Sequence, residues 1–250
     1  MQEICIETLN LIVDIGNNSA KFFLFQGEQM ILHTRRTGEA YDVIGEWNST
    51  YSIEGAIVSS VLDLTEEQKR HFDNLQCPVI WFNHETRSPL TIKYETPHTL
   101  GTDRLAAAIG AWNEAKGKNI LVIDAGSAIT IDLVDRNGNY LGGNISPGIK
   151  MRLNALHHFT GRLPLVDKEG DMPMIGYNTE TAIRSGVIRG ICHEIDGYIT
   201  TVKEKYSDVL VFLTGGDENP LKNSIKSRIF ADKYLVAKGL NRILLENNND

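Results

Sequence analysis

Two segments of the sequence share one design although they lie far apart in the chain. "LIVDIGNNSAKFFLF" at 11–25 and "LVIDAGSAITIDLV" at 121–134 each begin with an apolar run that ends in Asp-X-Gly, pass through small polar residues and return into a second apolar run. Asp14 of the first segment corresponds to Asp124 of the second, 110 residues later. Two β-hairpins of one design at this separation indicate a duplicated lobe rather than a short repeat array. The pattern favours a ligand bound between the two lobes.

The rest of the chain alternates between short apolar runs and helical patterns, which is typical of a mixed α/β protein. "DRNGNY" at 135–140 places Asn-Gly between two apolar runs, and this predicts a tight hairpin, so at least part of each sheet should be antiparallel. The expected strands are 11–15, 21–25, 30–35, 55–60, 79–82, 120–124, 128–134, 140–145 and 209–214. The expected helices are 65–75, with Thr65 as its cap, 102–115, 149–159 and 179–205.

Length and composition agree with two lobes. With 250 residues, of which 42% are hydrophobic, the chain can bury two cores of about 100 to 150 residues each. The two hairpins then suggest an N-terminal lobe at 1–115 and a C-terminal lobe at 116–250.

Charge, cysteines and hydropathy exclude several classes of protein. Lys and Arg number 25 against 32 Asp and Glu, and the net charge of −7 argues against nucleic acid as a partner. Cys5, Cys77 and Cys192 are odd in number and widely spaced, which suits reduced thiols better than disulfides or a metal site. The apolar runs are too short to cross a membrane, and the amino terminus has acids where a secretory signal has bases. We therefore expect a cytoplasmic protein that binds no membrane.

The residues of the two hairpins suit a polyphosphate. A tight turn with a glycine lets backbone N–H groups approach an anion, and neutral side chains beside it can bond phosphate oxygens. Lys21 adds a positive charge, whereas Asp14 and Asp124 would repel phosphate unless a cation lies between. Alternatively, each Asp-X-Gly is an ordinary hairpin corner, and the duplication is what favours a ligand site. The glycines and neutral side chains concerned are Gly16, Asn17, Ser19, Gly126, Ser127 and Thr130.

A third element follows the expected strand at 209–214. "LTGGD" at 213–217 brings Gly215 and Gly216 to a strand end, where a flat ring can lie against bare backbone. A Gly-Gly pair in this position is also common in ordinary loops. Its order after the two hairpins favours the ligand interpretation.

Six motifs together resemble one family. In chain order they are "DIGNNSAK", "GTDRLAAAIGAW", "DAGSAITID", "GGNISPG", "NTETAIRSG" and "TGG". This series resembles the type III pantothenate kinases, which belong to the superfamily of acetate and sugar kinases, Hsp70 and actin, and the resemblance runs from about residue 11 to 240. Asn18 and Ser127 stand where the family usually has Thr. Ser127 keeps the hydroxyl, whereas Asn18 replaces it by an amide.

The resemblance implies two duplicated ribonuclease H-like lobes, each with a mixed sheet flanked by helices, and a nucleotide in the cleft between them. It implies ATP-dependent phosphorylation of the primary hydroxyl of pantothenate to 4'-phosphopantothenate, the first step of coenzyme A biosynthesis. It also implies Mg²⁺ near Asp14, held through water, a monovalent cation, K⁺ or NH₄⁺, near Asp124, and a homodimer. The ATP-binding residues it implies are Asp14, Gly16, Asn17, Asn18, Ser19, Ala20, Lys21, Ser127, Thr130, Gly215 and Gly216.

The resemblance also implies the residues around pantothenate. Phosphoryl transfer requires a group that takes the proton from the attacking hydroxyl, and Asp103 is the candidate base, although an acid in the first turn of a helix is common. Arg104 can fork onto a carboxylate, which pantothenate possesses. Tyr94 matches a substrate-site tyrosine, and Thr179 matches a residue that reaches the partner subunit's pocket, with a helix cap as its plainer alternative. Gly101 and Thr102 complete the implied substrate-binding set.

Two other functions remain open from the sequence. The first is a polyphosphate or nucleotide phosphatase on the same fold, which would turn over ATP without pantothenate. The second is a regulatory relative without catalysis. The presence of Asp14, Lys21, Asp103 and Asp124 argues against that second alternative.

Overall fold

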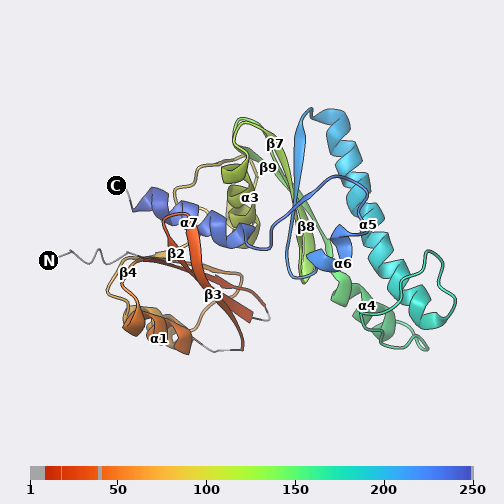
Figure 1. Ribbon diagram of the computed structural model, residues 1–250, viewed down its shortest axis with the longest axis horizontal. Helices are drawn as coiled ribbons and strands as arrows, with labels where there is room; N and C mark the ends of the chain where they lie inside the picture. Colours follow the sequence, from red (N-terminus) through yellow and green to blue (C-terminus); the bar gives the residue numbers. More distant parts are fainter. Residues whose placement is uncertain (1–8, 18, 39–40, 249–250) are drawn as a thin grey trace. The chain divides into compact units, whose positions relative to one another are not determined.

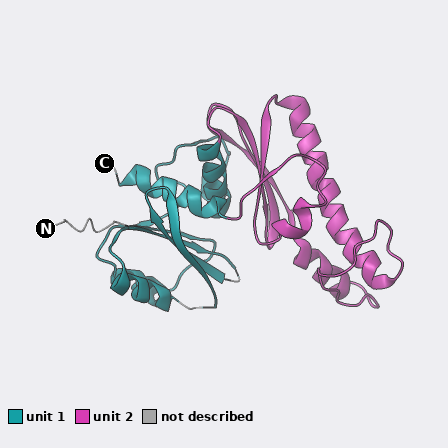
Figure 2. Ribbon diagram, viewed as in Figure 1, with its two compact units in different colours: residues 1–114, 234–250 teal, residues 115–233 magenta. Residues whose placement is uncertain are grey.

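The computed structural model describes residues 9–17, 19–38 and 41–248. The chain forms two compact units, unit 1 with residues 1–114 and 234–250, and unit 2 with residues 115–233 (Figure 2). The C-terminal segment thus returns to the unit in which the chain begins. This differs from the division at 115/116, which left residues 234–250 in the C-terminal lobe.

Unit 1 is built on a mixed sheet of five strands with the order β3-β2-β1-β4-β5. β2 is antiparallel to β1 and β3, whereas β4 is parallel to β1 and β5. β1 and β2 are apolar and buried at almost every position because helices cover both faces of the sheet. The strands are β1 (Leu9–Ile15), β2 (Ser19–Gln26), β3 (Gln29–Thr37), β4 (Ile53–Ser60) and β5 (Val79–Trp81).

Two pairs of helices cover this sheet. α1 (Asp42–Thr50) and α2 (Glu66–Asp73) bury Trp47 and Phe72 in a core with β1, β2 and β4. Thr65 caps α2, as the sequence predicts, and it forms a reciprocal capping box with Gln68. The other pair is α3 (Thr102–Glu114) and α7 (Leu235–Asn247), and two short elements precede α3, β6 (Thr91–Ile92) and η1 (Pro97–Thr99).

α7 lies against α3, β1 and β4 (Figure 1). A Cβ on Gly110 would collide with the carbonyl oxygen of Leu235, and one on Gly239 with that of Ala106, so the two helices approach at glycines. The side chain of Asn241 in α7 donates to the Gly27 carbonyl at 2.7 Å. This packing places residues 234–248 in unit 1, and the sequence did not predict α7 or α1.

Unit 2 repeats the topology of unit 1. Its strands lie in the order β9-β8-β7-β10-β11, with β8 antiparallel to β7 and β9, and β10 parallel to β7 and β11. This order matches β3-β2-β1-β4-β5 strand for strand, which confirms the duplication predicted from the two hairpins. The strands are β7 (Asn119–Ala125), β8 (Ala128–Val134), β9 (Asn139–Pro147), β10 (Val209–Thr214) and β11 (Phe230–Ala231).

The predicted hairpin between β8 and β9 is confirmed. The loop from Asp135 to Gly138 closes with the Asp135 N–H donating to the Asn139 carbonyl at 3.0 Å. Gly138 has a positive φ of 78°, which glycine tolerates, and the Asp135 side chain accepts from the N–H groups of Asn137 and Asn139.

Helices of unit 2 cover the face of the sheet that carries Ile123, Ile131 and Leu213. They are α4 (Ile149–His158), α5 (Thr179–Lys205) and α6 (Glu218–Lys222). α5 has the bounds that the sequence predicts. A long loop at 159–178 joins α4 to α5, and we refer to it as the α4–α5 loop (Figure 1).

Cys77 and Cys192 are free thiols in the structure. Burial raises the pKa of the Cys192 thiol to about 11 and also raises the pKa of Cys77, so both are poor nucleophiles at neutral pH. Cys5 lies outside the described residues. Within the described part of the chain, no helix is long and apolar enough to cross a membrane, and no cluster of three His, Cys, Asp or Glu residues could hold a metal.

Candidate functional site

The first hairpin connects β1 to β2 in unit 1. The Gly16 N–H donates to the Ser19 carbonyl at 3.0 Å, which closes the turn and leaves Asn17 exposed at its tip. Asn18 lies outside the described residues. Asp14 stands two residues before Gly16 and is only 7% exposed, and Ala20 is also buried.

Four polar residues form a row across the sheet of unit 1. Arg35, Lys21, Asp14 and Ser59 occupy directly paired positions on β3, β2, β1 and β4, so their side chains share one face. We call these four residues the unit 1 row. Lys21 Nζ lies 2.9 Å from Asp14 Oδ2, and Arg35 Nε donates to the Ser19 hydroxyl at 2.9 Å. An ion pair thus offsets the charge of the buried carboxylate.

A hydrogen bond connects the unit 1 row to the first turn of α3. Ser59 is fully buried, and its hydroxyl lies 2.9 Å from the hydroxyl of Thr102, to which it donates. Thr102 is the first residue of α3. A side-chain hydrogen bond therefore connects the strand beside Asp14 to the helix that carries Asp103 and Arg104.

All the residues predicted for the substrate except Thr179 lie at or near this end of α3. A Cβ on Gly101 would lie 2.6 Å from Asp103 Oδ1, so the carboxylate folds back over a residue that must be small. Asp103 Oδ1 also accepts the N–H of Arg104 at 2.8 Å. The guanidinium of Arg104 lies over the ring of Tyr94, 5.9 Å from its centroid, and Arg104 is only 5% exposed. The structure thus brings Tyr94 and Arg104 together within unit 1.

The second hairpin connects β7 to β8 in unit 2. The Gly126 N–H donates to the Ala128 carbonyl at 3.0 Å, and Ser127 is exposed at the tip. Four residues at directly paired positions form the unit 2 row, and they are Ile145 of β9, Thr130 of β8, Asp124 of β7 and Thr214 of β10. The hydroxyl of Thr130 is buried and has no hydrogen-bond partner among the described residues. Such an orphaned hydroxyl can serve a ligand.

Glycines pack closely against this second hairpin. A Cβ on Gly148 would collide with the Gly126 carbonyl oxygen. One on Gly215 would collide with the Ala125 carbonyl oxygen and lie 2.5 Å from Asp124 Oδ1, and Gly215 has a positive φ of 101°. Gly216, in contrast, has open space around it. The "TGG" segment and the second hairpin, predicted separately, are therefore in contact.

An ion pair fixes the residue after "TGG". The Asp217 N–H donates to the Ala125 carbonyl at 2.9 Å, and the Asp217 carboxylate lies 2.6 Å from Lys168 Nζ. Lys168 belongs to the α4–α5 loop. This loop is thereby joined to the strand end that carries Gly215.

Thr179 is the first residue of α5. The cap of α5 is Asn178, which forms a reciprocal capping box with Thr181, so the alternative that Thr179 is the cap is wrong.

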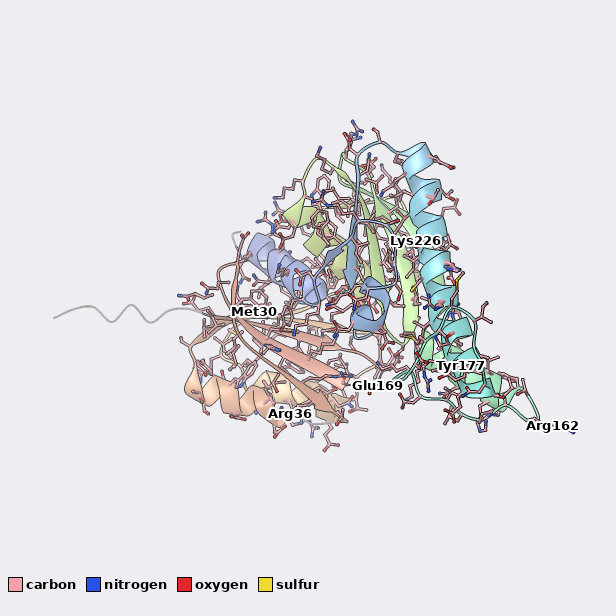
Figure 3. The ribbon with its side chains drawn as sticks, turned by 45° about the vertical axis from the view of Figure 1, so that its right-hand side comes forward. Met30, Arg36, Arg162, Glu169, Tyr177 and Lys226 are labelled. Atoms are coloured by element: carbon pink, nitrogen blue, oxygen red, sulfur yellow. The ribbon has the colours of Figure 1, made fainter. Side chains whose placement is uncertain are left out.

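Thr179 is exposed and lines an apolar groove of about 810 Å³ between α4 and α5. Phe159 lies in the same groove and is 81% exposed. Ile175 and Tyr177 of the α4–α5 loop are also exposed, and Tyr177 is labelled in Figure 3.

Sequence reasoning missed three residues of these sites. Ser59 and Arg35 join the unit 1 row, and Gly148 packs on the second hairpin. "IVSS" at 57–60 was an available signal for Ser59 because polar residues at the end of an apolar strand often line a site. No local pattern marks Arg35, whose place depends on the register between β2 and β3.

Comparisons with known proteins identify the family of the chain. The family model described as type III pantothenate kinase matches residues 10–201. A type III pantothenate kinase from Bacteroides fragilis (strain YCH46) is 52% identical over 240 residues, which cover 96% of this chain and 99% of that protein.

Solved structures extend the comparison. A crystal structure from Campylobacter jejuni, described as a conserved Baf family transcriptional activator, is 27% identical with a TM-score of 0.60 and covers 96% of this chain and 100% of its own. A ROK family glucokinase from Streptomyces griseus, in complex with glucose and AMPPNP, shares the fold with a TM-score of 0.53 at 9% identity, and covers 95% of this chain and 99% of its own. The family match over residues 10–201 and the 52% identity over nearly the whole chain establish the family. The chain belongs to the type III pantothenate kinase family.

Proposed function

We propose that this chain transfers the γ-phosphoryl group of ATP to the primary hydroxyl of pantothenate. The products are 4'-phosphopantothenate and ADP, and the reaction is the first step of coenzyme A biosynthesis. Family membership supports the activity. The observation from the fold that carries the proposal is the Ser59–Thr102 hydrogen bond, which joins the unit 1 row to the helix that begins with Thr102, Asp103 and Arg104.

The two hairpins bind ATP in this proposal. Their closed turns present backbone N–H groups and small side chains, which suit phosphate oxygens. Lys21 adds a positive charge, and the bare backbone at Gly216 suits the flat ring of the adenine. The residues assigned to ATP are Asp14, Gly16, Asn17, Asn18, Ser19, Ala20, Lys21, Ser127, Thr130, Gly215 and Gly216.

Magnesium fits the residues around Asp14. The ion usually keeps several waters and takes one or two carboxylates together with substrate phosphates. Asp14 offers one carboxylate, and the described residues contain no cluster of three acids or histidines for a protein-only site. Asp14 would therefore hold Mg²⁺ through water, with ATP as the other ligand. When bound, Mg²⁺ neutralises charge on the phosphates.

A monovalent cation, K⁺ or NH₄⁺, fits the residues around Asp124. Such a cation prefers oxygen ligands, and Asp124 supplies a carboxylate at the end of β7. The facing residue, Thr130, supplies a buried hydroxyl that has no hydrogen-bond partner among the described residues. The cation would balance the charge of Asp124 beside the phosphates of ATP.

Asp103 takes the proton in the proposed reaction. The pantothenate hydroxyl oxygen attacks the γ-phosphorus, the bond from that phosphorus to the bridging oxygen of ADP breaks, and the hydroxyl proton passes to the Asp103 carboxylate. Asp103 lies in the first turn of α3, where the N–H groups of the helix favour a negative charge. The hydrogen bond from the Arg104 N–H fixes the carboxylate over Gly101.

Arg104 and Tyr94 bind the carboxylate end of pantothenate. The guanidinium of Arg104 forms a planar fork that matches a carboxylate, and the Tyr94 ring beneath it limits its orientations. Because Arg104 is almost fully buried, a charge-assisted bond to the substrate is weakly screened by solvent. Gly101 and Thr102 complete this end of the substrate site.

We also propose that two copies of the chain pair through the α4–α5 face. The groove between α4 and α5 is apolar, and the exposed side chains of Phe159 and Ile175 suit burial against another apolar surface. Thr179 lines this groove, so pairing would carry it towards the partner subunit. Sedimentation equilibrium tests the pairing, since Ile175→Asp should produce monomers and the exposed Val61→Asp in unit 1 should leave dimers. A wild-type monomer at micromolar concentration would refute it.

The activity is tested with the purified chain, ATP, Mg²⁺ and K⁺, with and without pantothenate. We expect ADP and phosphopantothenate in equal amounts, identified by mass, and little ADP when pantothenate is absent. ADP formation that does not depend on pantothenate would favour the phosphatase alternative. No ADP with either mixture would favour a protein without catalysis.

A further inference from the structure

Arg35 occupies a position in the unit 1 row that none of the proposed roles uses. It lies on β3 directly opposite Lys21 of β2, and its Nε donates to the Ser19 hydroxyl at 2.9 Å. Ser19 is one of the buried residues of the first hairpin, whereas Arg35 is exposed to solvent. An exposed guanidinium is therefore bonded to a buried hydroxyl in the turn assigned to phosphate.

The bond decides how Ser19 can interact with a ligand. A serine hydroxyl has one hydrogen to donate and two lone pairs that accept. Because Arg35 donates to the Ser19 oxygen, it occupies an accepting position of that oxygen. The hydroxyl hydrogen is then directed away from Arg35 and suits an acceptor such as a phosphate oxygen. Arg35 thus orients Ser19 as a donor.

The charges of the unit 1 row also favour the binding of a phosphate group. The positive charge of Lys21 lies 2.9 Å from the negative charge of Asp14, so these two residues offset one another. Arg35 is the second cation of the row, and it gives the row a net positive charge. A polyphosphate approaching the first hairpin is attracted by this net charge.

The neighbouring Arg36 provides a built-in comparison. It pairs with Ala20, so its side chain leaves β3 on the opposite face of the sheet from Arg35. Its guanidinium donates to the Thr34 hydroxyl and to the Arg35 carbonyl, both on β3 itself. Figure 3 labels this residue. The guanidinium of Arg35 therefore bonds to Ser19 of the hairpin, whereas the guanidinium of Arg36 bonds to β3 itself.

We propose that Arg35 is a positioning residue for the nucleotide, which orients the Ser19 hydroxyl towards a phosphate oxygen and gives the unit 1 row its net positive charge. The inference deepens the proposed function, since it takes the polyphosphate of ATP as the ligand of the first hairpin. Arg35 acts through Ser19 and through its charge. It takes no part in transferring the proton.

The test measures dissociation constants of Mg–ATP and of inorganic tripolyphosphate by calorimetry, together with steady-state kinetics. Arg35→Gln should weaken binding of both by about tenfold, in the range of a charge-assisted hydrogen bond. Arg35→Lys, which keeps the charge, should recover part of this loss, and Arg36→Gln should match the wild type. The kcat at saturating ATP and the KM for pantothenate should not change.

A double-mutant cycle tests whether the effect passes through Ser19. If it does, Ser19→Ala should weaken ATP binding less in the Arg35→Gln background than in the wild type, because the orienting bond is already lost. Additive losses would overturn this part of the proposal. Equal losses for Arg35→Gln and Arg36→Gln, or no loss for Arg35→Gln, would overturn the whole.

Failure of the proposed function is distinguishable from failure of this inference. A wild-type protein that makes no phosphopantothenate would contradict the kinase activity, whereas the tripolyphosphate arm still compares Arg35→Gln with the wild type. Loss of kcat, ATP binding and pantothenate binding together in Arg35→Gln, with a lower melting temperature, would show a purely structural role and overturn the inference.

Discussion

The two hairpins have the same place in the same topology, but different interactions hold them. In unit 1 the hairpin is fixed by charged side chains, with Lys21 bonded to Asp14 and Arg35 to Ser19. In unit 2 it is fixed by backbone packing, since Gly148 and Gly215 approach its carbonyl oxygens so closely that no side chain fits. A duplicated fold can therefore preserve a turn while its surroundings differ, with an ion pair and an arginine bond at the first hairpin and closely packed glycines at the second.

The two rows show the same divergence at single positions. The unit 1 row reads Arg35, Lys21, Asp14 and Ser59, and the unit 2 row reads Ile145, Thr130, Asp124 and Thr214. The aspartate is retained in both, but an isoleucine and a threonine stand where unit 1 has two cations. In the unit 1 row, Lys21 and Arg35 thus supply positive charges beside Asp14. Ser59 of the same row is also hydrogen-bonded to the start of α3.

The largest effect is expected where the unit 1 row meets α3. Asp103→Asn keeps the shape of the side chain but removes its ability to accept a proton, so kcat should fall by about 10²- to 10⁴-fold. Asp42→Asn is the matched control, since Asp42 is also an acid in the first turn of a helix of unit 1. A kcat within about threefold of the wild type for Asp103→Asn, well short of the range for a general base, would exclude that role.

The steric support in unit 2 is tested by adding one methyl group. Gly215→Ala should lower the free energy of unfolding by about 2 to 4 kcal/mol, because it combines a left-handed φ with a collision against Ala125. Gly216→Ala should change it by less than about 0.5 kcal/mol, since open space surrounds that residue.

Gly16 of the first hairpin provides the comparison between units. A Cβ there would meet the Ser19 carbonyl oxygen at an ordinary 3.6 Å, so Gly16→Ala should destabilise the protein much less than Gly215→Ala. Urea unfolding curves measure all three variants. Equal losses at positions 16 and 215 would show that the hairpins are not held differently.

The electrostatic support in unit 1 is tested by Lys21→Met. This change leaves the buried Asp14 without its ion-pair partner, so ATP binding should weaken by about tenfold. The salt dependence of ATP binding should also become shallower than in the wild type. Lys69→Met is the control, because Lys69 pairs with Glu66 in the same unit and its side chain is equally exposed, at 44%. Equal effects of the two variants would contradict a specific role for Lys21.

The smallest effect concerns the cation of unit 2. The strand partner of Asp124 is the neutral Thr130, whereas the strand partner of Asp14 is Lys21, and we propose that a monovalent cation binds at Asp124. Replacing K⁺ by Na⁺ or Tris should lower turnover by about fivefold or more, in the range of typical coupling between two ligands. Full turnover in buffers that lack K⁺ and NH₄⁺ would contradict a monovalent cation site.

Local patterns predicted the elements that depend on local chemistry. The hairpins, the Thr65 cap of α2 and the bounds of α5 follow from apolar periodicity and from residues that favour turns and caps. α7 was missed although Val236, Leu240 and Ile243 have helical spacing, because the short segment has no side-chain cap and its face is buried by α3, far away in sequence.

The connections between elements could not be predicted from one sequence. The Ser59–Thr102 bond spans 43 residues, and it forms only because β4 ends beside the start of α3. The place of Arg35 beside Ser19 likewise depends on strand register, which a shift of one residue would turn to the other face. The candidate residues themselves were found because the duplicated hairpins and the family motifs mark them, whereas their mutual contacts needed the fold.

The decisive experiment for a reaction site that runs from the unit 1 row to Asp103 is calorimetric titration of pantothenate into the Asp103→Asn variant. If Asp103 is the base, the variant should bind pantothenate within about threefold of the wild type although its kcat has fallen, because the contacts of Arg104 and Tyr94 remain. If the dissociation constant for pantothenate instead rises as much as kcat falls, Asp103 acts in binding, and proton transfer belongs to another group.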